Sequence, residues 1–273
     1  MSTDDARLLP ETAEGTIITS SEIEGLELNG GYFTALNAMA STDHDSSNGG
    51  ALESIAFAGG TYAISDALSA SLYYSDVKVI ETEDDFEKFY GNLNYNMELG
   101  ADQSLAFDFN IYKTDVDAAD SDNVIWSLAS TYSFGAHGLT VAYQQNSGDD
   151  GYRYGLDGGG TIWVANSVQY SDFQGEDEKS WQARYDLSMD TYGVPGLSFM
   201  TRYVNGYDIS TATGEGKERE WDVEAKYVVQ DGPAKDLSLR VRHAKYWSNS
   251  DYVDYGTDLT DLRLIVEYPL SIL

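Results

Sequence analysis

Apolar and polar residues alternate along many stretches of this chain. In "SLAFDFNIYK" (104–113), Leu105, Phe107, Phe109 and Ile111 occupy one phase, and the other phase is mostly polar. Successive side chains of a β-strand point to opposite faces of a sheet, so this pattern predicts a strand with one apolar and one polar face. The same alternation recurs in "FYGNLNYNM", "SWQARYDL" and "EWDVEAKYVV". Each segment is close to the nine to eleven residues of a tilted membrane strand.

The connections between these segments fall into two alternating sets. Short, turn-like connections lie at 99–103, 134–138 and 192–196. The others are longer, polar and acidic, at 76–85, 114–123, 205–220 and 248–258. Short turns at one end and long loops at the other are typical of an outer-membrane barrel, whereas a Greek-key sandwich mixes loop lengths at both ends. We therefore predict an all-β fold, an antiparallel up-and-down transmembrane β-barrel.

The pattern gives about thirteen strands and no second domain. Bacterial barrels close with an even number of strands, so we expect roughly 18 in the complete barrel. The opening "MSTDDARLLPETAEG" lacks the charged and apolar regions of a secretory signal. We therefore interpret residues 1–273 as a single barrel domain whose N-terminal strands and signal peptide are missing.

Charge and composition exclude several classes of function. The chain carries 16 Lys and Arg against 46 Asp and Glu, a formal charge of −30. This argues against a nucleic-acid partner, because phosphate backbones are bound by clustered cations. There is no cysteine, and the three histidines fall in a loop, a turn and an outward strand phase. Neither "DHDSSNGG" (43–50) nor "DGGG" (157–160) has the spacing of a calcium loop. We expect no metal, no cofactor and no enzymatic activity.

The few cations are concentrated in the second half of the chain. Only four lie in residues 1–150, whereas ten lie in residues 180–263. Six of the ten occupy the polar phase of their strands: Arg184, Arg202, Lys226, Arg240, Arg242 and Arg263. In a narrow lumen walled by low dielectric, such a file attracts anions, and the planar guanidinium suits a carboxylate. The alternative is that these cations pair with lumen acids, namely Asp186, Asp222, Glu224 and Glu267.

The stretch 146–179 is too long for a plain loop in a compact domain. It contains Val164, Val168, Tyr170 and Phe173, which could pack against a barrel wall. Long loops of this kind are usually functional, and in a pore-forming barrel they fold inward to set its width. We therefore predict that this loop forms a constriction.

Long motifs over most of the chain after residue 100 resemble the OprD family of outer-membrane porins, the substrate-specific carboxylate channels of Gram-negative bacteria. They are "ANSVQYSDF", "EKSWQARYDLSM", "YGVPGLSFMTRYVNG", "AKYVVQDGPAKDLSLRVRHA" and "RLIVEYPLSIL". The resemblance implies an 18-strand barrel with inward-folded loops, a basic file down one lumen wall and a small acidic, tyrosine-bearing pocket. The basic file maps first onto Arg240, Arg242 and Arg263, and less directly onto Arg184, Arg202 and Lys226. The pocket maps onto Tyr170 and Asp172, with Asn166 and Ser167 beside them.

These features together predict an outer-membrane porin for diffusive uptake of small carboxylates or amino acids through an arginine-lined, loop-constricted pore. Asp172 would receive the ammonium of an amino acid, or would only cap a turn. The expected partners are a small anionic or zwitterionic substrate and outer-membrane lipid and lipopolysaccharide, with the protein as a monomer or weak trimer. The alternatives are a non-conducting surface barrel, acting as an adhesin or structural anchor, and a soluble acidic β protein.

Overall fold

The computed structural model of the chain describes residues 11–37, 42, 52–80, 85–117, 121–154, 162–254 and 256–269. The two segments compared with calcium loops, 43–50 and 157–160, lie outside the described residues. Within the described ranges, no group of three or more His, Asp or Glu side chains is placed to hold a metal ion. Those ranges also contain no helix with the length and apolarity that a membrane crossing would need.

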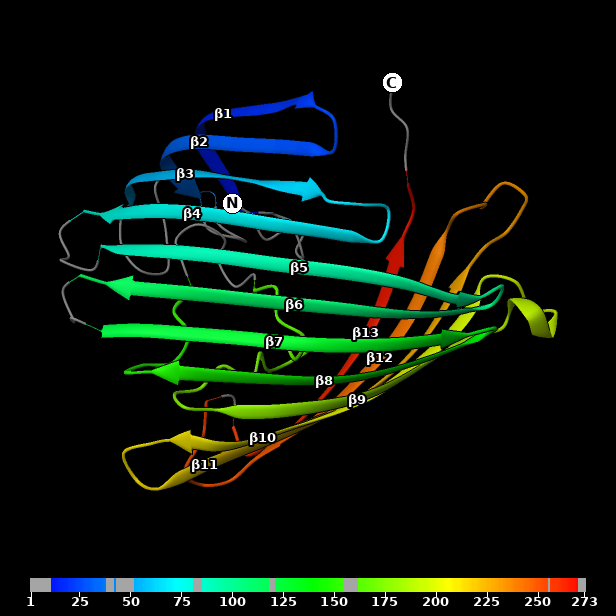
Figure 1. Cartoon of the computed structure of the whole chain (residues 1–273). Helices are drawn as coiled ribbons and strands as arrows, with labels where there is room; N and C mark the ends of the chain where they lie inside the picture. The colour runs from blue at the N-terminus through cyan, green and yellow to red at the C-terminus, as the bar shows by residue number, and fades with distance from the viewer. Residues whose placement is uncertain are drawn as a thin grey trace.

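The described residues form one sheet of thirteen antiparallel strands in chain order (Figure 1). The only helical element described is a single 3-10 turn, η1 (Asp190–Tyr192). The strands are β1 (Thr12–Ile23), β2 (Leu26–Asn37), β3 (Leu52–Ala63), β4 (Leu68–Val79), β5 (Phe86–Gly100), β6 (Gln103–Val116), β7 (Ser121–Phe134), β8 (His137–Gly148), β9 (Lys179–Ser188), β10 (Leu197–Ser210), β11 (Glu215–Val228), β12 (Ser238–Ser248) and β13 (Asp258–Glu267). Each strand pairs with the next, which confirms the predicted all-β, up-and-down arrangement.

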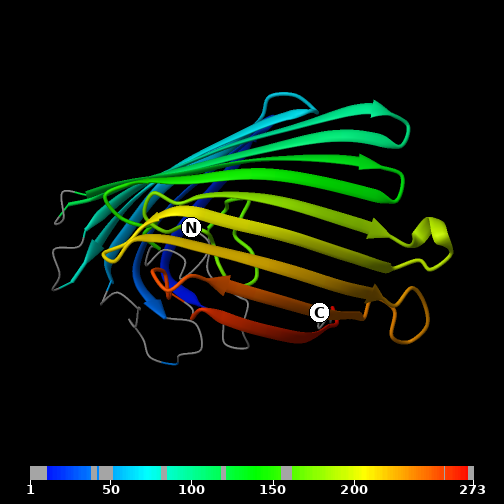
Figure 2. The same cartoon turned by 90° about the horizontal axis from the view of Figure 1, so that it is seen from below.

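The sheet curves around an interior that contains loop segments (Figures 1 and 2). β1 and β13 are its two edges, and among the described residues no pairing joins them. The larger total of roughly 18 strands stays a prediction.

The two phases of each strand face different environments. On β13, Leu262, Leu264 and Val266 are 62%, 74% and 68% exposed. On β8, Val141 is 63% exposed, whereas the next residue, Ala142, is buried. On these strands the apolar phase therefore faces outward, the reverse of a soluble sandwich and the arrangement that a lipid environment requires. On β2, β3 and β4 the inner face also carries a buried apolar cluster that includes Leu36, Ile55 and Val77.

Several strands extend farther than their apolar alternation predicted. Most of the stretch 205–220, expected as a loop, belongs to β10 and β11, and only 211–214 connects them. The backbone ladder continues beyond the apolar band, because antiparallel pairing needs no apolar side chains once two strands lie side by side. The strand count is unaffected, but the loops at this end are shorter than expected.

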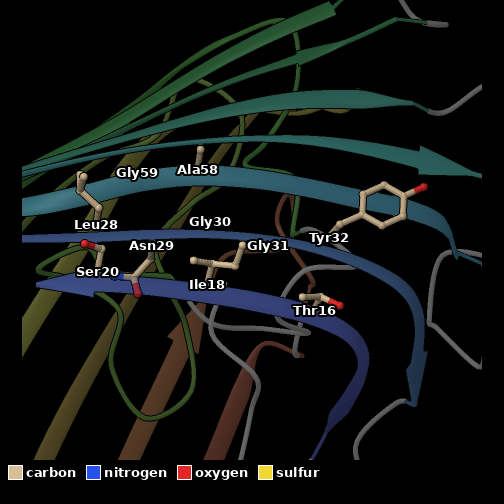
Figure 3. Close-up of a pocket in the computed structure, with 10 residues that line it drawn as sticks. All are labelled: Thr16, Ile18, Ser20, Leu28, Asn29, Gly30, Gly31, Tyr32, Ala58 and Gly59. Atoms are coloured by element: carbon tan, nitrogen blue, oxygen red, sulfur yellow. The ribbon is translucent and has the colours of Figure 1, made fainter.

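The outward face carries a groove of about 580 Å³ over β1, β2 and β3 (Figure 3). The side chains of Ile18, Leu28 and Tyr32 stand around it, and Gly30 and Ala58 leave the space between them. Ile18 is 71% exposed and Tyr32 is 53% exposed. The groove thus belongs to the apolar exterior and not to the interior where solutes would pass.

Candidate functional site

The described parts of the connection between β8 and β9, residues 149–154 and 162–178, lie on the inner side of the sheet (Figure 1). Its apolar residues Ile162 and Val164 pack with Tyr112 of β6 and Ile125 of β7 in a buried cluster. The Trp163 backbone N–H donates to the Tyr112 hydroxyl at 3.0 Å. This part of the loop is therefore fixed to the β6–β7 wall.

The following part of the loop reaches the opposite wall. The backbone N–H groups of Tyr170 and Ser171 donate to the two carboxyl oxygens of Glu220 on β11, at 2.9 and 3.0 Å. The Gln169 amide donates to Asp261 of β13 at 2.7 Å. The described part of the loop, green to yellow-green in Figure 1, therefore spans the interior from β6–β7 to β11–β13, as an inward-folded constriction requires.

Two buried side-chain amides of β8 also hold this loop. The fully buried Gln144 donates from Nε2 to the carbonyls of Asp172 and Phe173 at 2.8 and 2.7 Å. Its Oε1 accepts from the Asn166 backbone N–H at 3.0 Å. Asn146, two residues along the same face, donates to the Gln174 and Gly175 carbonyls, both at 2.8 Å. Sequence reasoning missed this clamp, although Gln144 and Asn146 share the polar phase of β8.

Most of the predicted pocket residues serve the internal structure of the loop. Asn166 is fully buried and donates to the Ser180 hydroxyl at 2.8 Å. Asp172 accepts from Ser167 at 2.5 Å and from the Tyr154 hydroxyl. Burial raises the pKa of Asp172, although both hydrogen bonds oppose that shift. The Tyr170 ring lies 6.1 Å from the ring of Tyr246 on β12. A role for Asp172 in receiving an ammonium stays a prediction.

Glu178 closes the base of the loop just before β9. It is fully buried, and its Oε2 accepts from the Gly175 backbone N–H at 2.8 Å. Burial, together with the nearby charge of Glu218, raises the pKa of Glu178 well above its usual value. The folded loop therefore binds the Glu178 proton more tightly than the unfolded chain does.

The six predicted cations all lie on the inner phase of β9 to β13. Arg184 pairs across the sheet with Arg202, Arg242 with Arg263, and Arg240 with Lys226. These three pairs are successive rungs, each two residues farther from the loop, or about 7 Å along the strands. The strand register therefore brings the six cations onto neighbouring rungs, and their role as a path for solutes stays a prediction.

Neighbouring carboxylates neutralise the rungs nearest the loop. Arg184 makes two hydrogen bonds of 2.7 Å to Asp186. Arg202 donates to Asp222 at 2.5 Å. Arg263 donates to Asp261, which also accepts from the loop residue Gln169. These pairs match the alternative interpretation, in which lumen acids take up the arginines.

The end of the basic file farthest from the loop has more positive than negative charge. Arg242 binds Glu224 of β11 at 2.7 Å, and Arg240 lies 3.6 Å from the same carboxylate. A second acid, Glu267, is 3.7 Å from Arg240 and is itself 57% exposed. The Arg240 Nε has no hydrogen-bond partner among the described residues. Lys226, directly across from Arg240, has no ion pair there either.

A polar cavity of about 430 Å³ lies on the inner side, against the β5–β6 wall. Its strand side is formed by Tyr90, Asn92, Asn94, Asp108 and Asn110, and its loop side by residues 162–165 and Ser167. The sequence pattern placed the Asn and Asp residues on a polar phase, but it singled out neither them nor Tyr90. The loop thus has the basic file on one side and an amide-rich cavity on the other.

The chain matches the model of the "outer membrane porin, OprD family" over residues 1–272. It is 47% identical to Porin D of Pseudomonas aeruginosa over 98% of its length, and covers 66% of that protein. Among solved structures, it is similar to P. aeruginosa OprD (47% identity, TM-score 0.85, 98% of this chain and 72% of that one). It is also similar to Acinetobacter baumannii OccAB1 (34% identity, TM-score 0.92, 99% and 71%).

The chain spans about two thirds of the length of the curated relatives it matches. Within that span, the strand arrangement and the sequence likeness agree over nearly every residue. These relatives are porins, so the comparisons do not favour the alternative of a surface barrel without a pore. The chain belongs to the OprD family of outer membrane porins.

Proposed function

We propose that this chain forms the selective wall of an outer-membrane porin that takes up small carboxylates or amino acids by diffusion. The observation that carries the proposal is the cluster of Lys226, Arg240 and Arg242 beside two carboxylates, Glu224 and the exposed Glu267. Three cations share two acids, so an anion entering this end of the file finds net positive charge. No bond is made or broken in this passage.

The arrangement of the rungs supports movement of the solute and argues against tight capture. Arg240 and Arg242 are only 21% and 24% exposed, so each keeps part of its charge accessible and part screened by Glu224. The carboxylate of a solute can replace Glu224 as the partner of one guanidinium without any large rearrangement. Successive sites of moderate strength allow both entry and release, which conduction requires. The loop that spans the interior limits the size of the solute at the end of the file nearest to it.

The surroundings of the porin follow from the same proposal. The outward apolar phase would contact outer-membrane lipid, and the acidic loops would lie near lipopolysaccharide. We propose a monomer or weak trimer, with no nucleic-acid partner. A soluble location is disfavoured by the exposed leucine, valine and tryptophan side chains on the outer face.

The test is ion selectivity in planar bilayers. Under a KCl gradient, we expect the wild-type protein to give an anion-selective reversal potential, and Arg240→Gln/Arg242→Gln to shift it toward cation selectivity. The matched control is Arg219→Gln, which removes one positive charge from the exposed phase of β11. Equal reversal potentials in wild type and the double variant would overturn the proposal, and so would a wild-type protein that does not conduct.

A further inference from the structure

The cavity on the β5–β6 wall is built from a continuous hydrogen-bond network. The Asp108 carboxylate accepts from the Asn92 amide at 2.8 Å and from the Asn110 amide at 3.0 Å. The Asn94 side-chain amide donates to the side-chain oxygen of Asn92 at 2.5 Å. The Tyr90 hydroxyl donates to the Asn110 oxygen at 2.7 Å. These bonds fix the position of each polar group, so the cavity has a definite chemistry.

That chemistry is dominated by acceptors. Tyr90 and Ser167 each use their hydroxyl hydrogen elsewhere, on Asn110 and Asp172, and keep only oxygen lone pairs. The Asn92 amide has three acceptors within 3.0 Å for its two hydrogens. Asp108 has no hydrogen to give, and the hydrogens left over are one side-chain N–H each on Asn94 and Asn110 and the Trp163 indole N–H. Acceptors therefore outnumber donors around Asp108, which favours a ligand that donates hydrogen bonds.

The cavity also carries a negative charge that the wall does not compensate. Asp108 is partly exposed and makes no ion pair within the described part of the chain. Trp163, which borders the same cavity, is 58% exposed and can offer its ring to a cation. Both groups favour a positively charged donor, such as an ammonium.

The loop places this cavity close to the basic file. Ser167 lines the cavity, and two residues later the Gln169 carbonyl lies 3.5 Å from Arg263 Nη2. Two residues of chain span at most about 7 Å, so the two charged regions flank one short loop segment. A solute with a carboxylate at one end and an ammonium at the other has the acidic cavity on one side of this segment and the basic file on the other, whose net positive end at Arg240 and Lys226 lies one rung beyond Arg263.

We propose that the Asp108 cavity is a subsite for the ammonium group of zwitterionic solutes. This deepens the proposed function, on which it rests, by assigning recognition of the cationic end to the β5–β6 wall. Asp172, the acid suggested by the sequence, is partly exposed like Asp108, but two hydroxyl groups of the loop itself already engage it, and it does not line this cavity. The subsite would raise the passage of amino acids relative to carboxylates that lack an amine.

The experiment compares two solutes that differ only in the ammonium, 4-aminobutanoate and butanoate, as fluxes into proteoliposomes. Asp108→Asn should lower the 4-aminobutanoate/butanoate flux ratio by about threefold, the scale of a partly exposed ion pair. Asp108→Glu should keep most of the ratio, because it keeps the charge. The matched control is Asp102→Asn in the exposed turn between β5 and β6. Unchanged butanoate flux in Asp108→Asn shows that the wall is intact, and an unchanged ratio would overturn the subsite.

Failure of the pore itself gives a different result. If neither solute enters with the wild-type protein, the proposed function fails, and binding is then measured directly by saturation-transfer NMR in detergent micelles. A 4-aminobutanoate signal that disappears in Asp108→Asn supports the subsite even then. Equal signals, or no signal from the wild-type protein, would overturn it.

Discussion

Gln144 makes three hydrogen bonds to the loop between β8 and β9, so its removal is a sharp test of how that loop is held. The Gln144→Ala variant loses two hydrogen bonds to loop carbonyls and one from the Asn166 backbone N–H. At about 1 kcal/mol for each bond, the loop loses about 3 kcal/mol of local stability. Every 1.4 kcal/mol is about a tenfold change, so the open population should rise about a hundredfold.

Hydrogen exchange followed by mass spectrometry measures this opening directly. Peptides covering residues 162–175 should exchange about a hundredfold faster in Gln144→Ala, with strand peptides unchanged. Single-channel conductance should rise in the same variant, because the loop no longer narrows the interior. The control is Gln145→Ala, the next residue of β8, whose side chain lies on the opposite phase. Unchanged exchange in residues 162–175 would show that β8 does not hold the loop and would refute the reasoning.

Two further predictions concern the base of the loop. Gly206→Ala should loosen it by about 1–3 kcal/mol, because a methyl group there overlaps the Glu178 carboxyl and the Phe173 ring. Faster hydrogen exchange in the loop checks this, with Gly100→Ala as the control because that site is open. The second prediction is pH-dependent. The folded loop binds the Glu178 proton more tightly than the unfolded chain, so loop stability is fully present below the usual pKa of 4.5 and decreases as pH rises through the raised pKa. Glu178→Gln should make that decrease in protection smaller, measured from about pH 4 to about pH 9, and an unchanged decrease would assign it to the other buried acids that contact the loop, Glu218 and Glu220.

The fold was predictable because its main determinant is local. In segments such as Leu105–Ile111, the period-two alternation fixes which residues face outward, and lipid contact makes that choice unambiguous. The predicted file of arginines follows from the same rule, because each arginine needs only the phase of its own strand. Strand ends were less predictable, since the ladder continues through 205–210 and 215–220 without an apolar pattern.

Partners across strands could not be predicted, because they depend on register. Arg240 and Arg242 have no acid on their own strand phase, yet Glu224 of β11 lies between them once the strands pair. Asp108 and Asn92 likewise sit on different strands, and only their pairing forms the cavity. From sequence alone, these residues are indistinguishable from ordinary polar positions on a wetted wall.

The most direct measurement is the flux of butanoate relative to the uncharged butanamide in proteoliposomes. If the basic file selects carboxylates, butanoate should pass faster than butanamide in the wild type, and Arg240→Gln/Arg242→Gln should reduce that preference by about tenfold. The Arg219→Gln control should keep it. A preference for butanoate that is the same in wild type and double variant would contradict the account, because the selectivity would then have to arise elsewhere in the pore.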